Sequence, residues 1–193
     1  LVANISEVLV VAASLFLTFH SGNVFILPLT AIQLLWINLL TDGLPDLALG
    51  VDKGEKGIMK RKPRDPKEKI LNNKIFKTLL AGGAIIAVYT LYLFAGSLQE
   101  GPEKARTVAF TTLVVFELAL VYVIRSLYKT QIFSNKYIHI SVLISLLLQL
   151  LVIYFQPLQS VFETTPLNPL DWIKIAALPI FAVLGSFAYS RLK

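Results

Sequence analysis

Six apolar stretches of the sequence are each long enough to cross a membrane as a helix. A hydrocarbon core of about 30 Å requires about 20 apolar residues in helical form. The stretches are apolar on all sides, which favours helices over the short alternating strands of an outer-membrane barrel. They lie at about residues 1–19, 28–48, 75–96, 108–125, 137–156 and 171–190. The pattern therefore predicts an all-α transmembrane bundle with six spans.

The composition excludes an ordinary soluble domain. Hydrophobic residues make up 55% of the 193 residues and charged residues 16%, and the mean hydropathy is +0.69. Soluble domains contain about 45–50% apolar residues. The chain has no Cys, which disfavours a carrier of soft metals such as Cu(I) or Zn²⁺.

Basic residues gather in alternate connections between the predicted spans. Half of the 18 Lys and Arg residues lie between Asp52 and Lys74, and the segments 125–136 and 191–193 are also basic. Because basic loops stay on the cytoplasmic side, we expect residues 51–74 to form a cytoplasmic loop. The net charge of +6 is then explained by topology and by contact with membrane lipid, and no nucleic-acid partner is expected.

The opposite connections are poor in basic residues. Residues 20–27 and 156–170 contain no Lys or Arg, and in residues 97–107 two basic side chains, Lys104 and Arg106, are offset by Glu100 and Glu103. This asymmetry orients the bundle with these connections outside.

Three carboxylates, Glu7, Asp42 and Glu117, lie inside predicted spans. An acidic side chain at the centre of a membrane helix costs about 3 kcal/mol even on lenient insertion scales, so such residues usually have a function. At 1.5 Å per helical residue they lie about 18, 21 and 15 Å from the outer ends of their helices. Because these depths agree, we expect the three acids to converge and to hold a cation.

Other oxygen-bearing side chains share helix faces with these acids. Asn4 and Glu7 are spaced i, i+3, and Asn38, Thr41 and Asp42 follow i, i+3, i+4. Carboxylate, amide and hydroxyl oxygens are hard donors that suit Ca²⁺, Mg²⁺, Mn²⁺ or alkali ions. The expected metal ligands are Asn4, Glu7, Asn38, Thr41, Asp42 and Glu117.

The first two spans are expected to be irregular. Gly43 and Pro45 follow Asp42 directly and weaken a helix, so the second span should be broken near Gly43, where free carbonyls could line an ion site. Only about 9 Å of helix precedes Glu7. The first span is therefore expected to be truncated at its beginning, and we expect the chain to be the C-terminal piece of a larger protein.

Four segments resemble parts of calcium-transporting P-type ATPases, in particular the sarcoplasmic/endoplasmic reticulum type. QLLWINLLTDGLPDLALG (33–50) resembles their sixth membrane helix, and NISEV (4–8) resembles the ligand-bearing part of the fifth. GIMKRKPRDPKEKIL (57–71) resembles the cytoplasmic loop after the sixth helix, and FELALVYVIRSL (116–127) resembles the eighth. The resemblance covers the whole chain in order, although the remainder matches only as hydrophobic spans.

The resemblance implies specific roles for the expected ligands. One calcium site would be formed by Asn4, Glu7, Thr41, Asp42 and Glu117. A second, to which Asn38 and Asp42 contribute, would be completed by the fourth membrane helix, which is absent from this sequence. Because the acids of the fifth and eighth helices are both present, the resemblance favours two ions per cycle.

The resemblance also places ATP hydrolysis elsewhere in the protein. The phosphorylated aspartate of the DKTGT motif and the nucleotide-binding domain do not occur in this sequence. We expect Mg²⁺ and ATP to act in upstream domains, so this segment has no catalytic residue and should not hydrolyse ATP alone. The upstream pump domains and the first four membrane helices are its expected partners, and proton countertransport is the expected accompaniment of calcium export.

Two other interpretations of the sequence stay open. One is an ion channel or secondary transporter that works without ATP, and the other is a structural bundle whose acids are paired internally. Gln33 and Gln149 are expected to bond between helices, and Gly82 and Gly83 to allow close helix packing. The short loops favour a multi-pass protein of a prokaryotic cell membrane.

Overall fold

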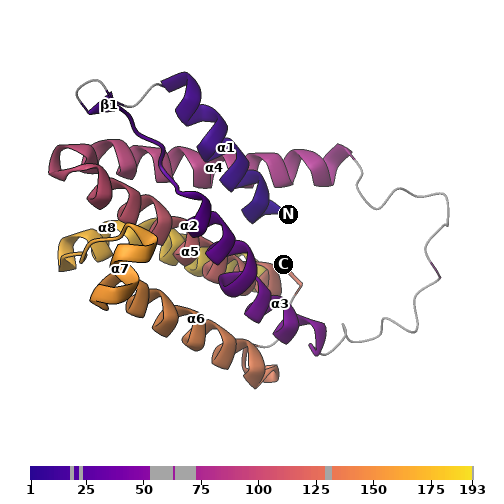
Figure 1. Cartoon of the computed structure of the whole chain (residues 1–193). Helices are drawn as coiled ribbons and strands as arrows, with labels where there is room; N and C mark the ends of the chain where they lie inside the picture. The colour runs from indigo at the N-terminus through magenta and orange to yellow at the C-terminus, as the bar shows by residue number, and fades with distance from the viewer. Residues whose placement is uncertain (18–19, 22–23, 53–62, 64–72, 129–131, 193) are drawn as a thin grey trace.

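The chain folds as a helical bundle. The computed structural model describes residues 1–17, 20–21, 24–52, 63, 73–128 and 132–192, and Figure 1 shows their arrangement. The α-helices are α1 (Val2–Leu17), α2 (Ala31–Trp36), α3 (Gly43–Gly50), α4 (Asn73–Ser97), α5 (Pro102–Leu127), α6 (Lys136–Tyr154), α7 (Gln156–Phe162) and α8 (Pro169–Leu192). A π-helical segment, η1 (Ile37–Thr41), joins α2 to α3, and 3₁₀ turns occupy Leu98–Glu100 and Ile132–Ser134. Two-residue strands, β1 (His20–Ser21) and β2 (Val24–Phe25), pair antiparallel.

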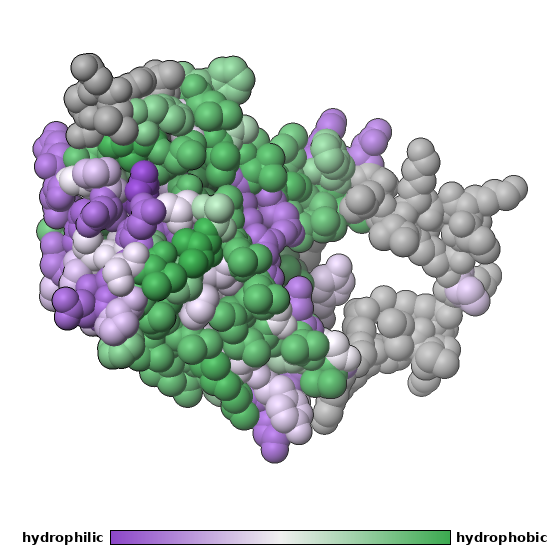
Figure 2. All heavy atoms as spheres, in the orientation of Figure 1, coloured by the Kyte–Doolittle hydropathy of each residue, from purple (hydrophilic) through white to green (hydrophobic). Residues whose placement is uncertain are grey.

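The predicted all-α transmembrane bundle is confirmed. Four helices, α4, α5, α6 and α8, are long and apolar enough to cross a membrane, and α1 is a shorter apolar helix. The second predicted span consists of α2, η1 and α3 in succession. Figure 2 shows apolar side chains over much of one face, as expected for a surface in contact with lipid. Most of the predicted basic loop 51–74 lies outside the described residues.

Helix α5 lies at the centre of the bundle. It packs against α1, α4, α6 and α8, and the side chains of Phe110, Leu113 and Val114 are fully buried. Small polar side chains such as Thr111 and Thr112 are also fully buried on this helix, where their hydroxyls can bond within the protein. Because α5 is surrounded by other helices, an acid on it lies inside the protein rather than against lipid.

The irregular turn of the second span lies before Asp42, not after it. The backbone N–H of Asp42 donates to the carbonyl of Ile37 at 2.9 Å, an i to i−5 bond, and the Thr41 hydroxyl donates to the same carbonyl at 2.9 Å. The expected break near Gly43 is therefore present, in the form of a π turn that ends at Thr41, two residues before Gly43. Pro45 is tolerated because it lies in the first turn of α3, where its missing N–H has no intrahelical role to fill. A π turn of this kind often occurs at a functional site.

The connections that the sequence predicts to lie outside are more structured than expected. Helix α5 begins at Pro102, earlier than the predicted span, because proline fits the first helical position. Lys104 pairs with Asp171, and Arg106 with Glu163 at 2.5 Å. These partners lie in α8 and at the end of α7, whereas the sequence suggested that Glu100 and Glu103 offset the two basic residues. The two ion pairs therefore connect the beginning of α5 with the C-terminal part of the chain.

Two buried glutamines bond between segments, as predicted. The Gln33 side chain donates to the carbonyl of Phe162 at 2.8 Å, and the Gln149 side chain donates to the Thr111 hydroxyl at 3.3 Å. Both glutamines are fully buried. Their amides therefore connect α2 with α7 and α6 with α5.

Close packing of α1 on α4 depends on Gly83. A Cβ at this position would lie 2.6 Å from Cγ2 of Ile5 and 3.3 Å from the backbone nitrogen of Ser6. We expect Gly83→Ala to separate the two helices and to lower the stability of the full-length protein by about 1–3 kcal/mol, the usual cost of overpacking. Thermal unfolding in detergent measures this change. Gly96→Ala on the same helix is the control, because a Cβ there meets nothing within 4 Å, and an equal loss in both variants would contradict the packing argument.

Candidate cation site

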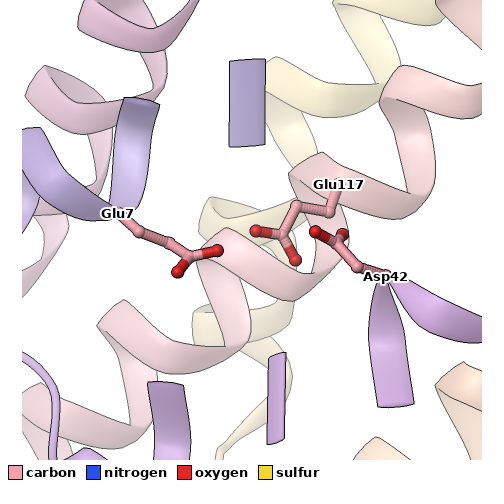
Figure 3. Close-up of side chains that lie close together, drawn as sticks. All are labelled: Glu7, Asp42 and Glu117. Atoms are coloured by element: carbon pink, nitrogen blue, oxygen red, sulfur yellow. The ribbon is translucent and has the colours of Figure 1, made fainter. Parts of the chain in front are cut away.

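Three carboxylates from three helical segments meet inside the bundle. Glu7 comes from α1, Asp42 from the junction of η1 and α3, and Glu117 from α5. One oxygen of each lies within 4.8 Å of one oxygen of each of the others, and Figure 3 shows the three side chains pointing toward one another. Glu7 and Glu117 are only 6% and 4% exposed, and Asp42 is half-buried. The structure thus brings together the three acids that the depth argument expects to converge.

Several of these carboxylate oxygens lack hydrogen-bond partners. Among the described residues, Oε1 of Glu7 and both Oε atoms of Glu117 are buried with none. Two carboxylates at this separation repel by about 3–4 kcal/mol at an effective dielectric constant of 20. Buried charges are stable only when they are paired or bind a metal. The cluster therefore requires positive charge, either as a cation or as protons.

The two asparagines lie beside Glu7. The Asn38 side-chain amide donates to Oε2 of Glu7 at 2.7 Å and to the carbonyl of Leu34 at 3.0 Å. Asn4 donates in turn to Oδ1 of Asn38 at 3.1 Å. In this arrangement Asn38 orients one Glu7 oxygen, and its own carbonyl oxygen is already used by Asn4. Both asparagine side chains lie at the site, and through these hydrogen bonds they position the carboxylate of Glu7.

Thr41 contributes a buried hydroxyl to the same region. Its side chain is 1% exposed and donates to the Ile37 carbonyl. A hydroxyl that donates its hydrogen keeps lone pairs that can accept or coordinate. Thr41 can therefore offer an oxygen to a cation without losing the bond that stabilises η1.

A cavity of about 270 Å³ adjoins the acids. It is lined by one face of the second span, one face of α5, the beginning of α1 and one side chain of α4. The lining residues include Thr41, Asp42, Pro45, Asp46, Leu49, Leu79, Glu117, Leu120, Val121, Ile124 and Asn4. Asp46 is a further acid that the sequence reading did not select. Its spacing of four from Asp42 is the signal that could have identified it.

The donor set fits a hard divalent cation. In the part of the chain that the structure describes, Glu7, Asp42 and Glu117 form the one group of three acidic or histidine side chains placed to share an ion. Ca²⁺ takes 6–8 oxygen ligands in flexible geometry. The three carboxylates and the Thr41 hydroxyl are oxygen donors of this type. The geometry is thus suited to a hard divalent ion such as Ca²⁺.

Known proteins with similar sequences are cation pumps. Residues 26–192 match the family described as "Cation transporting ATPase, C-terminus". The chain is 41% identical to the calcium-transporting ATPase of Bacillus subtilis (strain 168), over 96% of the chain and 21% of that protein. It is 37% identical to calcium-transporting ATPase type 2C member 2 of Rattus norvegicus, over 78% of the chain and 17% of that protein. It is 39% identical to calcium-transporting ATPase 1 of Saccharomyces cerevisiae, over 75% of the chain and 16% of that protein.

The chain spans about a fifth of the length of the first of these curated relatives and less of the others. The matched portion includes the second span and the four long apolar helices. This is the membrane-embedded portion in the present fold, with several crossings of the bilayer. The chain therefore belongs to the P-type cation-transporting ATPases and corresponds to their C-terminal membrane part.

Proposed function

We propose that this chain forms the ion-holding half of the membrane domain of an ATP-driven calcium pump. The observation that carries the proposal is the convergence of Glu7, Asp42 and Glu117 within 4.8 Å, with three buried oxygens that no described residue bonds. A divalent cation at this point would neutralise most of the negative charge. The calcium-transporting ATPases among the similar proteins support Ca²⁺ as that cation.

The six expected ligands act in different ways in this proposal. The three carboxylates supply charge and oxygen donors, Thr41 supplies a neutral oxygen, and Asn38 and Asn4 orient Glu7. In more detail, we propose that the pump moves two ions per cycle. A membrane helix outside this chain would complete the second site. The presence of both Glu7 and Glu117 supports this form and the likeness to the reticulum type. The similar proteins include type 2C pumps, so that likeness stays a prediction.

The energy source lies outside this chain in the proposal. Domains upstream would bind Mg²⁺ and ATP, become phosphorylated, and move the first four membrane helices against the site. After the ion leaves, three clustered carboxylates repel one another unless they take up protons, which supports proton countertransport. The 41% identity to a Bacillus subtilis protein supports a prokaryotic cell membrane as the location.

Calcium uptake into vesicles tests the proposal. The full-length protein is reconstituted into liposomes, and ATP-dependent Ca²⁺ accumulation is followed for the native protein and Asp42→Asn. The charge count of a site sets its Ca²⁺ affinity, so we expect the variant to bind Ca²⁺ at least about 100-fold more weakly. Its uptake should therefore require a correspondingly higher Ca²⁺ concentration. Glu100→Gln removes one charge from an exposed site and should behave as the native protein.

Two results would contradict the proposal. Ca²⁺ flux of equal rate with and without ATP would indicate a channel or a secondary transporter. Native uptake by Asp42→Asn would show that the three acids do not hold the transported ion.

A further inference from the structure

The cavity beside the three acids extends toward one end of the bundle. On the second span it is lined by Asp42, Pro45, Asp46 and Leu49, and these residues follow helical spacing on one face. On α5 the residues Glu117, Leu120, Val121 and Ile124 repeat the same spacing. The cavity therefore runs from the acids toward the C-terminal ends of α3 and α5, the side on which α1 and α4 begin (Figure 1).

Asp46 is the charged residue that lines the cavity between the three acids and the C-terminal ends of α3 and α5. Beyond Asp42 and Glu117 the described lining residues of α3 and α5 are apolar except for Asp46. Its side chain is exposed, and its backbone N–H donates to the carbonyl of Asp42 at 3.0 Å. Four residues of helix place Asp46 about 6 Å from Asp42 along the axis. Among the described residues no side chain forms an ion pair with Asp46, and its negative charge faces the cavity.

A second observation supports a ligand position at the inner end of this cavity. Glu117 lines it, is 4% exposed, and has no hydrogen-bond partner for either oxygen among the described residues. The exposed carboxylate of Asp46, farther along the cavity, and the buried, unbonded carboxylate of Glu117 define a direction for a cation to move.

We propose that Asp46 is a capture carboxylate that draws the divalent cation into this cavity and passes it to Glu7, Asp42 and Glu117. The inference rests on the proposed function, because it assigns Asp46 to the entry of the same ion. A charged group at the mouth of a cleft with low-dielectric walls raises the local concentration of the opposite ion and speeds its association. Because Asp46 stays hydrated and lies one helical turn away, it acts on the rate of entry rather than as a ligand of the bound ion.

Rapid mixing of the full-length protein with Ca²⁺ tests this role. We expect Asp46→Asn to slow Ca²⁺ association by about three- to tenfold at low ionic strength, since one charge at this distance attracts a divalent ion by roughly that factor. The difference should shrink as salt is raised, because salt screens exposed charges. The number of ions bound at saturation should not change. Glu100→Gln, with the same loss of charge elsewhere, should associate at the native rate.

The outcomes separate this inference from the function on which it rests. Native association by Asp46→Asn, together with loss of binding by Asp42→Asn, would overturn the capture role and leave the calcium site in place. A lower number of bound ions in Asp46→Asn would show that Asp46 is a ligand and would also overturn it. Unchanged binding by Asp42→Asn would contradict the proposed function itself.

Discussion

Replacing Glu117 with Gln should remove high-affinity Ca²⁺ binding without destabilising the Ca²⁺-free protein. Both carboxylate oxygens of Glu117 are buried and lack a partner among the described residues, and two other acids lie within 4.8 Å. The substitution keeps the shape of the side chain and removes one negative charge. Because the two neighbouring acids repel this charge when no cation is bound, we expect the Ca²⁺-free protein to unfold at the same or a higher temperature.

The measurement is thermal unfolding of the full-length protein with a chelator and with Ca²⁺. A ligand that binds the folded state stabilises it, by about 2.7 kcal/mol at a concentration 100 times its Kd. The native protein should therefore be stabilised by Ca²⁺, whereas Glu117→Gln should respond little. Thr112→Ser, also buried on α5, is the control for a small change on the same helix and should keep the response.

This experiment separates an ion site from a structural bundle. If the acids were paired internally, removing the charge of Glu117 would leave a partner unsatisfied, and the Ca²⁺-free protein would lose stability. A lower unfolding temperature with chelator, together with a native response to Ca²⁺, would support that structural role. The missing partners of Glu117 are the reason for expecting the opposite.

The acidic centre could be predicted from the sequence because burial depth in a membrane helix follows from residue count. Glu7, Asp42 and Glu117 lie in three separate segments, yet a fixed rise of 1.5 Å per residue placed them at one level. The cost of an intramembrane acid identified them as a group with a function. The helix faces of Asn4 and Thr41 followed from the same periodicity.

Other features depend on contacts between distant segments and could not be predicted. At the π turn of η1 both Asp42 and Thr41 bond the Ile37 carbonyl, whereas Gly43 and Pro45 predict only that the span is irregular near this point. The hydrogen bond from Asn38 to Glu7 joins residues 31 positions apart. Helix α7 was missed because seven residues are too few for a clear periodic pattern.

The second large effect is expected at the buried ion pair of Lys104 and Asp171. Their side chains are only 10% and 4% exposed, and Asp171 also accepts a hydrogen bond from the backbone N–H of Asn168 at 2.8 Å. Lys104→Met would leave the Asp171 carboxylate buried without its cation. We expect a loss of about 3–5 kcal/mol in the free energy of unfolding, the usual cost of removing one partner of a buried pair.

The neighbouring pair of Arg106 and Glu163 provides the matched control. It joins α5 to the same region, yet its side chains are 22% and 52% exposed. Because exposed pairs contribute about 0–1 kcal/mol, Arg106→Gln should cost far less than Lys104→Met when chemical unfolding of the full-length protein is compared. Equal losses would show that burial does not decide the contribution of these pairs.

The double variant Lys104→Met with Asp171→Asn tests the cause of the loss. The amide of Asn at position 171 still accepts from the Asn168 N–H, and no buried charge is left unpaired, so much of the stability should return. Lys104 also lies about 20 Å along α5 from Glu117, so the Ca²⁺ affinity of the double variant should stay close to native. Recovered stability in the double variant would show that the single variant loses stability through the unpaired Asp171 carboxylate, and native Ca²⁺ binding would show that the ion pair is not needed to hold the ion.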